Sequence, residues 1–209
     1  VIMTSDAVIE SPISITANKD FILELEGKKI ETTYVSETST TYIANSNTVN
    51  LAGSLTINDK IGTGGIYTGK TGFDISLGTG GKLEINGGSY KGRTSVLINA
   101  SNTSAEINSG TFTSIYNNNV MSIGSNCSNC HLVINDGTIR AVESGSADNG
   151  HAIDYAGQSF TLENVTLGTN QTIYMSSNTG YIDIGINTPT LVIEPSTYTR
   201  GRDILKVTL

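Results

Sequence analysis

The sequence predicts an all-β fold, a right-handed parallel β-helix (a β-solenoid) of about seven coils with three short strands in each. Two observations predict it. A six-residue phrase recurs at intervals of roughly 22 to 32 residues, and a segment of alternating apolar and polar residues precedes most of its copies. A repeated phrase at such a period is typical of stacked coils, which together bury the apolar residues that one coil alone leaves exposed. The composition agrees with this fold, because only 15% of the residues are charged while small polar residues, which coil corners need, are abundant.

The repeated phrase reads apolar, Asn or Glu, two small or polar residues, then Ser, Thr or Lys, then a large apolar residue. Its clearest copies begin at Ile85, Ile107 and Ile134, looser copies begin at Leu25, Leu162 and Ile193, and a degenerate copy begins at Ile57.

The small and polar residues of the phrase are predicted to hold the corners of the coils. Asn tolerates left-handed backbone, and its side-chain amide can bond to its copy one coil away. The predicted ladder residues are Asn58, Asn86, Asn108 and Asn135. The glycines Gly88, Gly110 and Gly137 are interpreted as corner residues with positive φ. The Gly-rich run 62–65 precedes no helix pattern and no Gly-Lys-Ser/Thr, so it predicts a loop rather than a phosphate site.

Strict alternation places one side chain inside the coil and the next one outside. Alternating strands are expected at 49–51, 73–77, 96–98, 120–123, 152–155 and 173–175. After a short polar turn, a second strand carries the first residue of the phrase, and a third short strand starts from the large apolar residue that ends it. The second strands predict one inward row at Leu83, Ala105, Leu132 and Phe160, and an adjacent row at Ile85, Ile107, Ile134 and Leu162.

A single domain is expected from the length of 209 residues. Residues 1–20 are predicted to form an N-terminal cap and the first strands, and residues 21–209 are predicted to form the coils. Neither end resembles a natural terminus of an exported protein, so we expect the chain to be a piece of a longer one.

The charge of the chain excludes two classes of partner. The formal net charge is −7, and only 12 residues are Lys or Arg. Nucleic acids and anionic lipids both require a basic face, so we expect neither as a partner. No apolar run approaches the ~20 residues of a membrane span, so we expect no span in this chain.

Residues 21–30, Phe-Ile-Leu-Glu-Leu-Glu-Gly-Lys-Lys-Ile, resemble the opening coil of pectin-lyase-like β-helix domains, whose later coils end in Asn-Gly-Gly-Thr-like corners. The resemblance extends over residues 6 to 200, roughly, and is specific for the fold. Domains of this kind occur in large bacterial surface proteins, so the resemblance implies an extracellular or cell-surface location. The family includes polysaccharide lyases, glycosidases, phage tailspikes and non-catalytic adhesive modules, so the resemblance does not choose among these activities.

The family's enzymes use acidic calcium ligands with an Arg or Lys base, or clustered carboxylates that act as acid and base. Here the acidic residues are scattered. Glu84 and Glu106 share a phase, but Thr56 precedes them and Val133 follows them in that phase. The arginines are few, and Arg93 and Arg140 lie in similar phase but two coils apart. We therefore interpret Glu84 and Glu106 as residues of a solvated face, and we predict no catalytic residues, no cofactor and no metal site.

The motif Cys127-Ser128-Asn129-Cys130-His131 matches the c-type haem attachment signature, but it fills a turn between two strands and no helix follows it. His151 is the only other histidine, which disfavours a metal site, and no helix N-terminus lowers a thiol pKa for redox exchange. The turn is about three residues longer than its counterparts. A local disulfide between Cys127 and Cys130 would hold this insertion in an oxidising setting, and reduced thiols are the alternative.

The loops after the third strands vary most in length and are expected to line one edge of the stack. Variable loops on a rigid scaffold often carry binding residues, and Tyr suits contact with sugar rings and proteins. The candidate ligand-binding residues are Tyr67, Tyr116, Glu143 and Asp148.

The sequence thus predicts a non-catalytic β-helix module of a bacterial surface protein, which binds a glycan or a host or cell-surface protein. A polysaccharide lyase or glycoside hydrolase of the same fold is the first alternative, and it requires acidic residues that converge on a groove. A structural stalk or a phage-type receptor-binding domain is the second alternative, and the stalk requires a smooth surface with few loops.

Overall fold

The computed structural model describes residues 1–32, 46–69, 72–115, 119–124 and 127–141, and five later strands at 153–155, 160–162, 165–167, 173–175 and 182–184. These described residues form strands and turns and contain no helix. None of them, accordingly, forms a helix that is long and apolar enough to cross a membrane.

The strands follow one another along the chain as β1 (Ala7–Ile9), β2 (Ile13–Ile15), β3 (Asp20–Glu24), β4 (Lys29–Thr32), β5 (Val49–Leu51), β6 (Ser54–Asn58), β7 (Gly65–Tyr67), β8 (Phe73–Leu77), β9 (Lys82–Gly92), β10 (Thr94–Ile98), β11 (Ser104–Ser114), β12 (Met121–Ile123), β13 (His131–Ile134), β14 (Gly137–Ala141), β15 (Ile153–Tyr155), β16 (Phe160–Leu162), β17 (Val165–Leu167), β18 (Ile173–Met175) and β19 (Ile182–Ile184).

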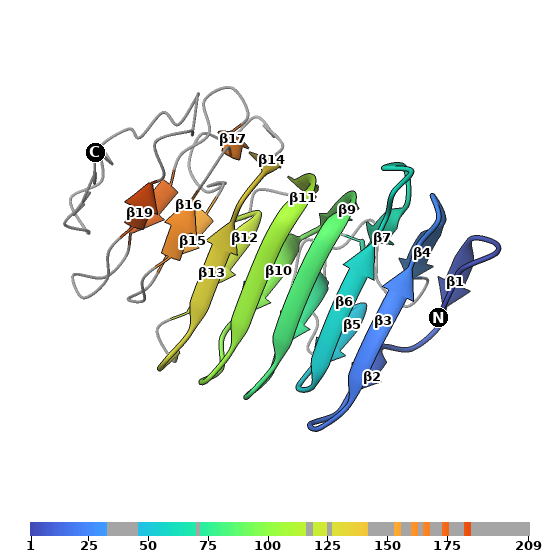
Figure 1. Ribbon diagram of the computed structural model, residues 1–209, viewed down its shortest axis with the longest axis horizontal. Helices are drawn as coiled ribbons and strands as arrows, with labels where there is room; N and C mark the ends of the chain where they lie inside the picture. Colours follow the sequence, from blue (N-terminus) through green and yellow to red (C-terminus); the bar gives the residue numbers. More distant parts are fainter. Residues whose placement is uncertain are drawn as a thin grey trace.

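The described strands form two parallel sheets, in which each strand pairs with its copy in the next repeat of the sequence (Figure 1). The second sheet runs from β2 at one edge through β5, β8, β10, β12 and β15 to β18 at the other edge. The first sheet contains the strands of the repeated phrase, with β6, β9, β11 and β13 side by side. The predicted all-β architecture with parallel, stacked strands is therefore confirmed.

The predicted register is confirmed for the copies of the phrase that begin at Ile57, Ile85, Ile107, Ile134 and Leu162. The copy predicted to begin at Leu25 is wrong by two residues, because Leu23 pairs with Ile57 and Glu24 with Asn58. The copy predicted at Ile193 lies outside the described residues. Ile57 pairs with Ile85, Ile85 with Ile107, and Ile107 with Ile134. All four side chains are fully buried, and the neighbouring inward residues Leu83, Ala105 and Leu132 are at most 3% exposed. In the backbone register, Phe160 pairs with Leu132 and Leu162 pairs with Ile134, as predicted.

The core also receives inward rows from the second sheet and from the strands that end the phrase. The second sheet contributes Val49, Ile75, Val96, Met121 and Ile153, all buried. At the end of the phrase, the rings of Tyr90 and Phe112 stack at 4.9 Å between centroids and are fully buried. Burying these rows is what one coil alone cannot achieve, so the stack stabilises each coil.

Two corners differ from the expected pattern. β9 and β11 each continue through the phrase as one strand of 11 residues, bending at the glycines instead of stopping there. Gly88 has φ 95° and Gly110 has φ 142°, so the predicted positive φ is confirmed. The prediction of a loop over 62–65 is wrong for Gly65, which begins β7 and pairs with Ser89.

A ladder of side-chain amides connects the outer face of the first sheet. Asn86 Nδ2 donates to Asn58 Oδ1 at 2.9 Å, Asn108 Nδ2 to Asn86 Oδ1 at 2.8 Å, and Asn135 Nδ2 to Asn108 Oδ1 at 2.6 Å. At the N-terminal end, Asn58 Nδ2 donates to the Glu24 carboxylate at 2.7 Å. All four amides of the ladder thus donate in one direction, toward the Glu24 carboxylate. A negative charge is favourable at this end, because it accepts from the last donor of a row of aligned amide dipoles.

Asn86→Ala is expected to lower the free energy of unfolding by about 1–3 kcal/mol, because it leaves part-buried groups on both neighbours without partners. Asn86 donates to Asn58 and to Glu84, and it accepts from Asn108. Urea denaturation measures the effect. The control is Ser122→Ala on the outer face of β12, which should change stability by less than about 0.5 kcal/mol. Equal effects of the two substitutions would show that the ladder contributes nothing.

Candidate functional site

The outer face of the first sheet carries a shallow open depression of about 280 Å³. Four adjacent strands, β6, β9, β11 and β13, contribute to it, so its floor is a regular parallel sheet. Its lining consists of Ser54, Leu55, Thr56, Lys82, Leu83, Glu84, Ser104, Ala105, Glu106, His131 and Val133. The outward residues of this set are hydroxyls, carboxylates, one ammonium and one imidazole, with Val133 as an apolar neighbour.

Glu84 and Glu106 lie side by side in the depression. They are directly paired in the parallel register of β9 and β11, and neighbouring strands of a sheet lie about 4.7–4.9 Å apart. Glu84 accepts hydrogen bonds at both oxygens, from Thr56 Oγ1 at 3.3 Å and from Asn86 Nδ2 at 3.1 Å. Two carboxylates at this distance attract a ligand that offers hydroxyl or cationic groups.

The Glu106 side chain is exposed, and Asn135 Nδ2 donates to its Oε1 at 3.2 Å. Both carboxylates are thus oriented by amides of the Asn ladder. The ladder gives this face fixed hydrogen-bonding directions, which a solvated row of glutamates would lack.

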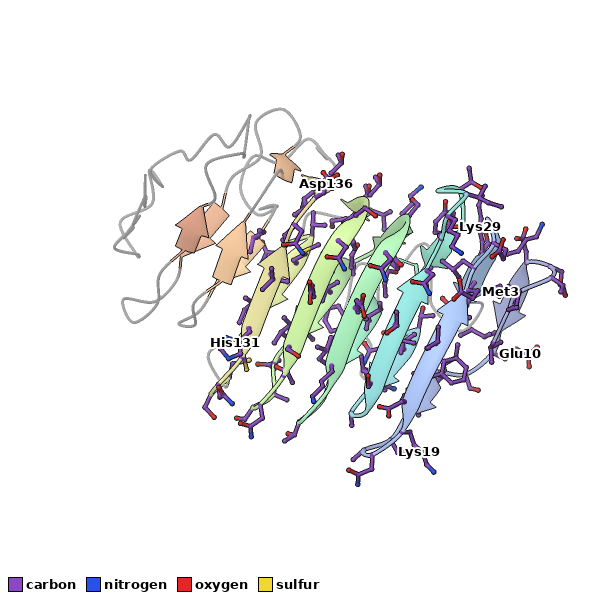
Figure 2. All side chains as sticks on the ribbon, viewed as in Figure 1. Met3, Glu10, Lys19, Lys29, His131 and Asp136 are labelled. Carbon is purple, nitrogen blue, oxygen red and sulfur yellow. The ribbon has the colours of Figure 1, made fainter. Side chains whose placement is uncertain are left out.

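The start of the strands forms the other side of the depression, with Lys82, Ser104 and His131 in one row. Figure 2 shows His131 at the start of β13, at the end of the sheet face. Its Nε2 lies 3.2 Å from Asn129 Oδ1 in the preceding turn. The depression therefore combines both signs of charge with neutral donors and acceptors.

The motif Cys127–His131 lies in the turn before β13. Seven residues, 124–130, separate β12 from β13, whereas four, 78–81, separate β8 from β9, so the predicted insertion is confirmed. The turn stacks on the one before it through Ser128 Oγ and Ser101 Oγ at 2.8 Å and through Asn129 Nδ2 and Asn102 Oδ1 at 3.0 Å.

Both cysteines are buried thiols in the structure. Cys127 Sγ lies 3.3 Å from the Ile98 carbonyl oxygen, and Cys130 Sγ lies 3.0 Å from that of Ala100. Burial, followed by hydrogen bonding and charge interaction with Cys130, raises the pKa of Cys127 to about 12. A thiol with such a pKa is a poor nucleophile and a poor metal ligand. The disulfide between the two cysteines stays a prediction. Across the described ranges, no group of three or more His, Cys, Asp or Glu side chains could hold a metal ion.

Of the candidate ligand-binding residues, Tyr67 lies on β7 and is half-buried. The Lys29 ammonium sits over its ring, 5.0 Å from the centroid, so one face of the ring already has a cation–π partner. Tyr116, Glu143 and Asp148 lie outside the described residues. Tyr67 does not line the depression, which contains instead Glu84 and Glu106, two residues interpreted from the sequence as part of a solvated face. The sequence contained a signal for the depression. Positions 82, 104 and 131 fall two residues before positions 84, 106 and 133, so alternation places the polar side chains of both rows on the same outer face.

The carboxyl group of Asp74, outside the depression, is buried at the corner between the two sheets. Asp74 is fully buried, and its Oδ1 accepts from the backbone N–H of Thr68 at 3.2 Å, while its Oδ2 has no hydrogen-bond partner. A Cβ at Gly92 would lie 2.6 Å from Asp74 Oδ1, so this carboxyl fits only because position 92 is glycine. Burial raises the pKa of Asp74 well above its usual range, and hydrogen bonds from Thr68 and Ser95 offset this only in part.

The stability contributed by Asp74 is expected to fall as the pH rises from about 4, the ordinary pKa of Asp in an unfolded chain. The folded state keeps the proton on Asp74 where the unfolded state has lost it, so each rise in pH favours unfolding until the folded-state pKa is passed. Urea denaturation of the parent and of Asp74→Asn across this pH range measures the effect. The stability of the parent relative to this variant should decline with pH, and a constant difference would contradict the neutral buried carboxyl.

Comparisons with protein-family models, with curated proteins and with solved structures find no match to this chain.

Proposed function

We propose that this chain is a non-catalytic glycan-binding module of a bacterial surface protein, with a right-handed parallel β-helix of about seven coils as its scaffold. The resemblance of residues 21–30 to pectin-lyase-like domains supports the family and the extracellular location. The depression over β6, β9, β11 and β13 is the proposed binding site.

The observation that carries this proposal is the paired, amide-oriented carboxylates of Glu84 and Glu106 in an open depression. Sugar hydroxyls both donate and accept, and they need acceptors and donors at fixed positions. Carboxylate oxygens accept, Lys82 donates, and the serine and threonine hydroxyls do both. An open, shallow shape admits a chain that runs across the strands, along the axis of the stack.

A second candidate function follows from the same pair. Retaining glycosidases place two carboxyl groups ≈ 5–5.5 Å apart, and the side chains of paired residues on strands about 4.7–4.9 Å apart reach such distances. Glycoside hydrolysis or, with Lys82 as base, polysaccharide cleavage by elimination is therefore the alternative activity. The non-catalytic function is favoured because Glu106 is exposed and the depression is open, so the pair stays accessible to water, whereas catalytic sites exclude it.

A glycan array combined with an assay for released sugar ends tests the proposal. The variants are Glu84→Gln and Glu106→Gln, and the matched control is Glu31→Gln, on β4 and away from the depression. Tyr67→Ala and Tyr116→Ala test the loop edge as the binding surface. Binding that is lost in the two depression variants and kept in the control and tyrosine variants is the expected result.

Other results identify the alternatives. Reducing or unsaturated sugar ends that appear with the parent and vanish with Glu84→Gln or Glu106→Gln would establish an enzyme. Binding lost only with Tyr67→Ala and Tyr116→Ala would move the site to the loop edge. Selective binding to a protein receptor, with no glycan bound, would replace the glycan by a host or cell-surface protein. Neither binding nor turnover would leave a structural stalk or a phage-type receptor-binding domain.

A further inference from the structure

The side chains of the depression form two parallel rows across β6, β9, β11 and β13, and the charged groups of the two rows differ. The carboxylate row consists of Thr56, Glu84, Glu106 and Val133. The lysine row, two residues earlier on the same strands, consists of Ser54, Lys82, Ser104 and His131. Neighbouring positions within a row lie about 4.7–4.9 Å apart, and the two rows lie roughly 6.4–6.8 Å apart along the strands.

Glu84 and Glu106 are adjacent in the carboxylate row, so their negative charges repel each other. Within the part of the chain that the structure describes, no Lys or Arg forms an ion pair with either side chain. Their hydrogen-bond partners are the neutral groups of Thr56, Asn86 and Asn135. A ligand cation placed over the pair is attracted by both charges at once and offsets their repulsion.

The lysine row limits where such a cation fits. Lys82 is exposed and, among the described residues, forms no ion pair of its own. Its ammonium disfavours a second positive group on its side of the depression, whereas the hydroxyls of Ser54 and Ser104 both donate and accept. The two rows together therefore suit a ligand with positive groups along one side and hydroxyl groups along the other.

The surroundings of the pair favour an organic ammonium over a metal ion. Across the described ranges, no group of three or more His, Cys, Asp or Glu side chains could hold a metal, so the two carboxylates lack further ligands of this kind. The other members of the carboxylate row are a hydroxyl, at Thr56, and an apolar side chain, at Val133. A sugar ring offers partners for both, because it carries hydroxyls at its rim and C–H groups on its faces.

We propose that the ligand of this depression is a glycan with free amino groups, whose ammonium groups bind over Glu84 and Glu106 while its hydroxyls face the lysine row. This inference rests on the proposed glycan-binding function and specifies its substrate class. Glu106 should contribute more than Glu84. Both oxygens of Glu84 already accept hydrogen bonds, from Thr56 and Asn86, whereas Glu106 accepts at one oxygen within the described part of the chain.

Isothermal titration calorimetry with two matched probes tests the inference. The probes are a glucosamine oligosaccharide and its N-acetylated counterpart of the same length, in a buffer that contains EDTA and keeps the sugar amino groups protonated. The glucosamine oligosaccharide should bind about fivefold more tightly or better, the factor expected for one charge pair at about 4 Å in water. Glu106→Gln should remove most of this preference.

Glu31→Gln is the matched control, because it makes the same charge change on β4, outside the depression. The chain has a formal net charge of −7, which attracts any cationic ligand as a whole. The control variant should keep the affinity and the preference of the parent. An equal loss in Glu31→Gln and Glu106→Gln would show that binding follows the overall charge, and it would overturn the inference.

Lys82→Gln tests the orientation of the ligand, because it removes a positive charge and keeps a hydrogen-bond donor. This variant should bind the glucosamine oligosaccharide about two- to threefold more tightly, since it no longer repels an ammonium roughly 7 Å away. Its affinity for the N-acetylated probe should stay the same. Weaker binding of the glucosamine oligosaccharide by Lys82→Gln would contradict the placement of the ammonium groups over the carboxylate row.

The remaining outcomes separate this inference from the function on which it rests. Equal or tighter binding of the N-acetylated probe, lost in Glu84→Gln and Glu106→Gln, would keep the glycan-binding function and overturn the amino-group inference. Tighter binding of a lysine oligopeptide than of the glucosamine oligosaccharide would assign a basic peptide to the depression and overturn it as well. Binding of none of these probes would also overturn it, while the glycan array decides the function independently.

Discussion

Replacing Ile107 with Asp is expected to prevent folding, or to leave a chain that unfolds far below the temperature of the parent. Ile107 is fully buried, between Ile85 and Ile134 of the neighbouring strands. An Ile→Ala change at such a site already costs about 2–5 kcal/mol, and a buried carboxylate without a partner costs more. Since a domain of this size is stabilised by about 5–15 kcal/mol in total, the loss approaches the whole. Thermal unfolding followed by circular dichroism measures it.

The matched control is Thr111→Asp, which introduces the same side chain four positions further along β11. Thr111 is exposed on the outer face and pairs with Ser89 and Thr138. The control should lose at most about 1 kcal/mol, the range of strand propensities. Equal melting of Ile107→Asp and the parent would mean that position 107 faces outward and that the assigned register is wrong.

The second large effect is expected from Gly65→Ala. A Cβ built at Gly65 would overlap the carbonyl oxygen of Ser89 on the adjacent strand, and backbone cannot move aside as a flexible side chain can. The variant must therefore break the pairing of β7 with β9 or shift one of the two strands. We expect a loss of about 3 kcal/mol or more, measured by urea denaturation.

Gly78→Ala serves as the control for this substitution. A Cβ at Gly78 would lie 3.6 Å from the Leu51 carbonyl oxygen, an ordinary contact, so the variant should be within about 1 kcal/mol of the parent. If Gly65→Ala were as stable as Gly78→Ala, the close approach of β7 and β9 would be incorrect.

The architecture and the inward rows could be predicted because successive side chains of a strand point to opposite faces. Once one face of the strand is buried, the orientation of every side chain along it is fixed. The row Leu83, Ala105 and Leu132 and the amide bonds along the Asn ladder followed from repeated residues at one phase. In each case the same residue type, or the same polarity, recurs wherever the chain returns to the same place.

The role of the ladder residues in the backbone was predicted wrongly. Asn86 and Asn108 lie within extended strands, whereas positive φ values occur at other asparagines in the turns before β3, β11 and β13, namely Asn18 (61°), Asn102 (58°) and Asn129 (57°). In the turns, asparagine is suited because it tolerates positive φ. On the face of the sheet, it is suited because its side-chain amide bonds to the next asparagine of the ladder. Residue type alone does not separate these two uses.

The close packing of Gly65 and the burial of Asp74 could not be predicted either. Both depend on how near two segments come at a corner, which is set by the lengths of turns and not by the repeated phrase. The candidate site has the same limitation. The phase of Glu84 and Glu106 was visible in the sequence, but the depression depends on the bulk of the side chains around them.

The central claim is that the repeated phrases stack in parallel, one on the next. Nuclear Overhauser contacts between isoleucine methyl groups test it most directly, because paired strands lie about 4.7–4.9 Å apart. In protein labelled only at isoleucine methyls, Ile85 should contact both Ile57 and Ile107, and Ile107 should contact both Ile85 and Ile134. Absence of the contact between Ile85 and Ile107, in a folded protein with assigned methyl signals, would contradict the stacked arrangement.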